Sequence, residues 1–145
     1  MSDNTAVLAE DMERLVREYV LHTKQMNLHF EDFVNCSNSN NFARLESKRS
    51  MFLTAHQRRV KVLADLRPVL TEFELSPDVA HIKVWNAARE IRLHRGDEFV
   101  MDCINLMNRE IARLKDRNYL LESVTEAHTE GVLRLREFER SLPSG

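Results

Sequence analysis

Apolar residues recur in alternating steps of four and three over the last third of this chain. The row is unbroken as far as Leu114, and beyond that point polar residues interrupt it four times. A repeat of 3.5 residues keeps one stripe of a helix facing a partner helix, so the pattern predicts the seam of a coiled coil or helical bundle. The row consists of Val100, Ile104, Met107, Ile111, Leu114, Asn118, Leu121, Thr125, His128, Val132, Leu135, Glu139 and Leu142.

Two further helices are predicted before this seam. The first covers residues 5–35 and carries apolar side chains at the same alternating steps. An Asn- and Ser-rich stretch then favours a short loop, because these side chains compete for backbone hydrogen bonds. The second helix covers residues 42–73, with one of the asparagines just before it as cap. Pro68 lies inside its apolar pattern and is expected to kink it.

The third predicted helix covers residues 77–142. Ser76 is expected to cap it, and Pro77 suits the first helical position because its missing N–H would have no partner there. A continuous helix over this range would be on the order of 100 Å long. Gly96 and Gly131 are its weak points, where it could bend or break.

These elements predict an all-α fold in a single helical domain over residues 1–145. We expect an antiparallel helical bundle or coiled coil of three long helices, with the third extended or folded back as a fourth. The composition agrees, since only 3 Gly and 3 Pro occur among 145 residues. A net charge of −2 argues for neither a nucleic-acid nor a membrane partner.

The chain is expected to work in the cytoplasm. It opens without a basic stretch followed by an apolar run, and no apolar run reaches the length of a membrane span. Cys36 and Cys103 lie far apart and form no CxxC pair. They are therefore predicted to be two free thiols in a reducing compartment.

Metal binding and catalysis find little support in the residues. The paired Glu-x-x-His motifs of di-iron helical proteins do not occur, and His22 and His29 would lie about 10 Å apart along one helix. Cys103 has no sequence neighbour that would lower its pKa, and three glycines cannot form a phosphate-binding loop. We therefore expect no metal site, no cofactor, no catalytic residue and no enzyme activity.

Two basic clusters are candidate nucleic-acid contacts. One covers residues 56–61, and the other consists of Arg89, Arg92, His94 and Arg95. Both fit the solvated faces of helices, and the overall charge does not favour nucleic acid. The expectation is that neither cluster binds nucleic acid.

Protein binding is the function that the seam favours. Its second half is an amphipathic helix with no obvious internal partner, and such a helix either self-associates or takes a helix of another protein. A fourth core helix and a homodimeric coiled coil remain open as alternatives. The predicted partner-binding residues are Leu114, Leu121, Val124, Val132, Leu135, Phe138 and Leu142.

The layout resembles the FlgN family of flagellar export chaperones and the related FliT-type chaperones. The resemblance rests on size, on the short polar break after the first helix, and on the opening of the second helix at residues 41–53. A tryptophan early in the third helix, Trp85, fits as well, and so does the spacing of Ile104, Asn108 and Leu114. One departure is the run at residues 92–97, which matches the family's pattern only in part.

What the resemblance implies is a chaperone that holds hook-associated export substrates in the cytoplasm. In the family, the carboxyl-terminal helix clasps the amphipathic terminal helix of the substrate and is mobile when empty. The chaperone then delivers the substrate to the type III export gate. The alternative is a coiled-coil scaffold or adaptor that acts through self-association, for example as a homodimer.

Overall fold

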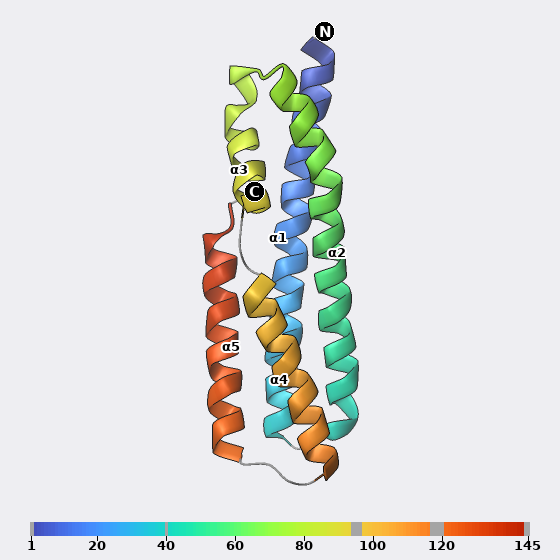
Figure 1. Cartoon of the computed structure of the whole chain (residues 1–145), viewed down its shortest axis with the longest axis vertical. Helices are drawn as coiled ribbons and strands as arrows, with labels where there is room; N and C mark the ends of the chain where they lie inside the picture. Colours follow the sequence, from blue (N-terminus) through green and yellow to red (C-terminus); the bar gives the residue numbers. More distant parts are fainter. Residues whose placement is uncertain (1, 40, 94–96, 117–120, 144–145) are drawn as a thin grey trace.

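The computed structural model describes residues 2–39, 41–93, 97–116 and 121–143, and over these residues the chain is all-helical (Figure 1). The predicted all-α class is therefore confirmed. The elements are α1 (Ser2–Asn38), α2 (Phe42–Leu75), the 3-10 turn η1 (Val79–His81), α3 (Ile82–Leu93), α4 (Asp97–Asp116) and α5 (Leu121–Ser141).

Helices α1 and α2 run side by side in opposite directions along the whole length of the molecule (Figure 1). In the orientation of Figure 1, α3 packs beside their upper half, and α4 and α5 lie beside their lower half. The core accordingly has two parts. An upper cluster joins α1, the second half of α2, α3 and the end of α5, and a lower cluster joins α1, the first half of α2, α4 and α5.

Helix α1 continues past its predicted end at residue 35. Ser37 is buried, and its Oγ donates a hydrogen bond of 2.7 Å to Oε1 of the buried Glu110 on α4. Tertiary burial thus overrides the turn preference of the Asn- and Ser-rich stretch. Asn41 occupies the N-cap position of α2 but makes no side-chain capping bond.

Helix α2 is continuous through Pro68 as far as Leu75. Leu70 and Phe73 beyond the proline are fully buried, so the apolar face continues as the sequence predicts. Pro68 itself is exposed on the outer side. The backbone bond that its ring removes is therefore lost on the solvent side, where water can take the carbonyl.

The single helix predicted over residues 77–142 is corrected to η1, α3, α4 and α5. Gly96 lies outside the described residues, and α5 runs through Gly131 without interruption. Because α5 packs against α4, the chain folds back on itself, which was the other arrangement considered. On α4 the predicted seam is buried from Val100 to Leu114, with Ile104 partly buried.

The turn between α2 and α3 also differs from its prediction. Ser76 closes α2, since its N–H bonds to the carbonyl of Phe73. The cap of the following turn is Asp78, whose carboxylate accepts a bond of 3.0 Å from the N–H of Ala80. An aspartate side chain accepts hydrogen bonds from the free amides at a helix start as well as a serine side chain does. The residue types alone therefore could not decide between Ser76 and Asp78 as the N-cap.

Candidate partner-binding surface

The apolar edge of α5 faces the other helices. Leu135, Phe138 and Leu142 are buried, and Val132 packs partly buried against the lower core. The expectation of an apolar face with too few internal partners is therefore wrong here, because α5 lies along α1 and α4. A role of these residues in binding another protein stays a prediction. Two further predicted contacts have side chains outside the described part of the chain, Leu121 and Val124.

Gly131 brings α5 close to α1. A Cβ atom at this position would lie 2.9 Å from Cε1 and Cζ of Phe30 and 3.6 Å from Sγ of Cys103. Phe30 is fully buried, and its ring packs tilted against that of Phe52, with centroids 6.1 Å apart. The glycine that the sequence marked as a weak point of a helix is thus a point of close approach between two helices.

Polar contacts line both sides of this apolar edge. Nε of Arg136 on α5 donates a hydrogen bond of 2.7 Å to Oε1 of Glu31 on α1. Nη1 of Arg134 donates one of 3.1 Å to Oδ2 of Asp102 on α4, and its guanidinium lies 4.1 Å from the ring centroid of Phe99. These exposed pairs orient α5, but each contributes little free energy because water screens it.

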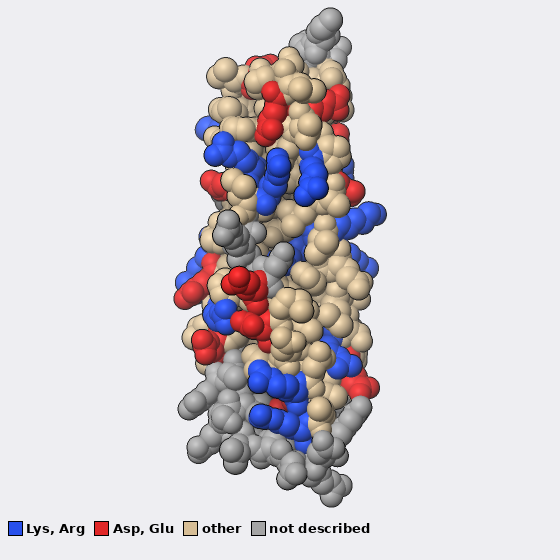
Figure 2. Space-filling view, in the orientation of Figure 1, with Lys and Arg blue, Asp and Glu red and all other residues tan. Residues whose placement is uncertain are grey.

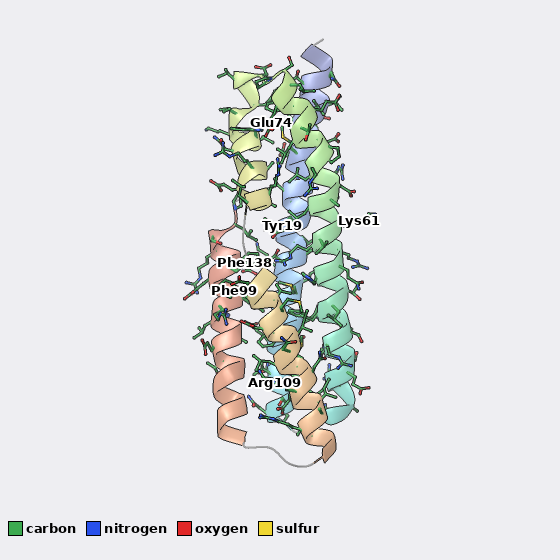
Figure 3. The ribbon with its side chains drawn as sticks, viewed as in Figure 1. Tyr19, Lys61, Glu74, Phe99, Arg109 and Phe138 are labelled. Carbon is green, nitrogen blue, oxygen red and sulfur yellow. The ribbon has the colours of Figure 1, made fainter. Side chains whose placement is uncertain are left out.

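The packing of α5 leaves a hollow on each side. The one between α4 and α5 has a volume of about 220 Å³ and is lined by residues that include Phe99, Cys103 and Arg109; Figure 3 labels Phe99 and Arg109 on α4. Burial raises the pKa of the Cys103 thiol to about 12. A thiol with so high a pKa stays protonated at neutral pH, and a thiol is a much weaker nucleophile than a thiolate.

The hollow between α1 and α5 is more open, at about 480 Å³, and Asn27 lies in its wall. Oδ1 of Asn27 is buried and accepts no hydrogen bond from any described residue. The hollow separates parts of the facing surfaces of α1 and α5, although the apolar edge of α5 itself is buried.

A buried arginine joins α2 to α5, and sequence reasoning missed it. Arg59 is 0% exposed, and its guanidinium carbon lies 5.5 Å from the ring centroid of Tyr19 and 5.1 Å from that of Phe138. Figure 3 shows Tyr19 on α1 and Phe138 on α5 at the same level of the molecule. Cation–π contacts of this kind are worth about 2 kcal/mol when desolvated.

The first basic cluster is divided by the fold. While Arg59 is buried, Lys61 is exposed and projects from the outer side of α2 (Figure 3). A signal for this was present, because Arg59 falls in the row of buried residues of α2, between Ala55 and Val62. Because arginine is charged, the sequence pattern did not identify it as a member of this buried row.

His22 and His29, the candidate metal ligands on α1, lie in other surroundings. Nδ1 of His22 lies 3.3 Å from Oε1 of Gln25, one turn along α1. Burial, followed by the charge of Lys48, lowers the pKa of His29, whereas Asp32 opposes this shift. In the described ranges no three His, Cys, Asp or Glu side chains come together as a metal site would require.

Cys36 and Cys103 are both free and buried. Within the part of the chain that the structure describes, none of the helices has the length and apolar character needed to cross a bilayer. Comparison with protein families, with curated proteins and with solved structures gave no match to this chain.

Proposed function

We propose that this chain is a helical chaperone, built as an antiparallel bundle, that binds an amphipathic helix of a flagellar hook-associated export substrate. It would keep that helix unassembled in the cytoplasm for type III export. The observation that carries the proposal is that the amphipathic helix α5 lies along α1 and α4 with a hollow on each side of it. A surface that accepts an amphipathic helix of its own chain offers the same apolar ridges to a helix of another protein.

The binding surface in this proposal has two parts. One is the apolar edge of α5, with Leu135, Phe138 and Leu142. The other is the surface that this edge covers, chiefly on α1 and α4 and, at the end of α5, on the upper core. The client helix enters between them when α5 moves aside. The hollows beside α5 support the idea, because side chains that do not touch add nothing to the free energy needed to lift α5.

Hydrogen exchange on the full chain tests the proposal. The probe is a synthetic peptide with the sequence of the terminal amphipathic helix of a hook-associated protein. Without the peptide, we expect the amides of α5 to exchange faster than those of α1 and α2, because α5 opens alone. A saturating concentration of peptide should slow the exchange of α5. Binding that leaves the amides of α5, α1 and α4 unchanged would contradict the proposal, as would an absence of binding.

A second candidate function, a scaffold acting through self-association, is favoured by one observation. Leu21 and Leu28 stand seven residues apart on α1 and are 52% and 58% exposed, so they form part of a heptad row facing outward. Sedimentation equilibrium over a concentration series separates the two candidates. A dimer that dissociates when Leu21 and Leu28 are changed to glutamate supports the scaffold, whereas a monomer at all concentrations excludes it.

A further inference from the structure

Arginine side chains from α2 and α3 are brought together at the upper half of the molecule. Nε1 of Trp85 on α3 donates a hydrogen bond of 3.2 Å to Oε1 of Glu74 on α2, which fixes the register of these two helices. Arg67 precedes Glu74 by seven residues, and Arg92 follows Trp85 by seven. Because α2 and α3 are antiparallel (Figure 1), two turns along each helix place Arg67 opposite Arg92.

A third arginine completes the group. The guanidinium carbon of Arg89 lies 5.0 Å from the ring centroid of Trp85, and Arg89 precedes Arg92 by three residues, so both lie on one side of α3. Figure 2 shows Lys and Arg side chains gathered over α3 and the neighbouring part of α2. We call Arg67, Arg89, Arg92 and Trp85 the arginine–tryptophan cluster.

The three arginines of this cluster are exposed, and no ion pair joins any of them to a carboxylate in the described ranges. Glu74, whose carboxylate accepts the indole N–H of Trp85, forms no ion pair with these arginines in the described ranges. Their guanidinium groups are therefore available to pair with an anionic ligand.

We propose that the arginine–tryptophan cluster binds an acidic segment of a partner protein through its carboxylates. A guanidinium matches a carboxylate with two parallel hydrogen bonds, and Arg89 is already oriented by stacking on Trp85, which lowers the entropy lost on binding. The cluster extends over only about two helical turns, or roughly 10 Å, which suits a short run of carboxylates. The net charge of −2 does not favour the long basic track that nucleic acid requires.

The surface is separate from the one proposed for the client helix. It uses exposed side chains of α2 and α3 that are not among those proposed to contact the client helix, although Phe138 and Leu142 of α5 share the upper core with these two helices. The inference therefore does not rest on the proposed chaperone function, and substitutions in one surface leave the side chains of the other unchanged.

The only tryptophan of the chain reports directly on this cluster. The full-length protein is titrated with a synthetic peptide of alternating glutamate and alanine, and the fluorescence of Trp85 is recorded at low salt. We expect a saturable change in emission. Arg67→Glu with Arg92→Glu should weaken binding by roughly tenfold or more, the effect of losing charge-assisted pairs. Both positions are exposed, so helicity and thermal midpoint should stay those of the unchanged protein.

A matched control carries the same change in charge elsewhere on α2. Arg58→Glu with Lys61→Glu alters two exposed positions, and Lys61 projects away from α3 (Figure 3). Affinity within about twofold of the unchanged protein is expected for this control. Equal weakening by both double variants would overturn the proposal, because binding would then follow net charge alone.

Two further results bear on the kind of ligand. The conservative change of Arg67 and Arg92 to lysine keeps the charge but removes the paired hydrogen bonds, so weaker binding supports the proposal and unchanged binding overturns it. A short single-stranded oligonucleotide that binds more tightly than the peptide would identify a nucleic-acid surface and overturn the proposal. The absence of a saturable change in Trp85 emission with the peptide would do so as well.

Discussion

The close approach of α5 to α1 at Gly131 can be tested by adding a single methyl group. In Gly131→Ala, the new Cβ lies 2.9 Å from two atoms of the Phe30 ring, well inside van der Waals contact. The ring cannot simply turn away, because Phe30 is fully buried and packs against Phe52. Either the ring leaves its preferred rotamer or α5 moves outward from α1.

Two opposing free energies decide the outcome. Replacing glycine by alanine inside a helix stabilises by about 1 kcal/mol. Overpacking a well-filled core by one carbon costs about 1–3 kcal/mol. The expected net result of Gly131→Ala is a loss of about 0–2 kcal/mol in the free energy of unfolding, although the same change in an exposed helix would stabilise.

Urea denaturation followed by circular dichroism measures this free energy. A double-mutant cycle with Phe30→Leu isolates the clash: once the ring is gone, Gly131→Ala should stabilise by up to about 1 kcal/mol. Glu137→Ala, at an exposed position of α5, serves as control and should stay within about 0.5 kcal/mol of the unchanged protein. If Gly131→Ala stabilises by about 1 kcal/mol with Phe30 in place, the reasoning about close approach is refuted.

Three further predictions concern Arg59, His29 and Cys103. Arg59→Ala should destabilise by about 2–5 kcal/mol in urea denaturation and Arg59→Met by less, because methionine keeps much of the volume; equal losses would contradict the packing argument. The pKa of His29 is below its ordinary 6.5, mainly through burial and then through the charge of Lys48. Its contribution to stability is therefore present above pH 6.5 and is lost as the pH falls through the lowered pKa. His29→Asn should flatten the dependence of the thermal midpoint on pH in that window. In a Cys36→Ala background, the Cys103 thiol, with its pKa near 12, should react with a disulfide reagent at neutral pH far more slowly than in urea; equal rates would show that Cys103 is accessible.

Hydrophobic periodicity alone was enough to predict the helical class and most of the core. On α1 the alternating row from Leu8 to Phe33 is buried at nearly every step, and on α4 the row from Val100 to Leu114 is buried as well. Burial of an apolar stripe is the main stabilising term of such helices, so the period identifies the inward face directly.

The course of the chain after Leu93 could not be obtained from that period. The same steps of four and three fit one long helix and a helix that folds back, because each presents one apolar stripe to a neighbour. Tertiary packing distinguishes the two arrangements. An example is the close approach of Gly131 to the Phe30 ring, which cannot be predicted from a local sequence pattern. Arg59 escaped prediction for a related reason: charged residues are rarely buried. The contacts that hold its guanidinium include the rings of Tyr19 and Phe138 and a ring nitrogen of His56.

The contact between Arg59 and Phe138 also contributes to the free energy needed to replace α5 by a client helix. Lifting α5 removes the Phe138 ring from the buried guanidinium and uncovers Leu135 and Leu142, so the closed arrangement is favoured until a client restores equivalent burial. The apparent client affinity is then the free energy of binding less that of opening. A change that weakens only the docking of α5, such as Gly131→Ala, should raise that affinity, whereas Leu135→Ala removes a side chain used in both contacts and should not. If α5 is merely a core helix, both changes destabilise the fold and neither raises affinity, so the direction of the Gly131→Ala effect on peptide binding decides between the two.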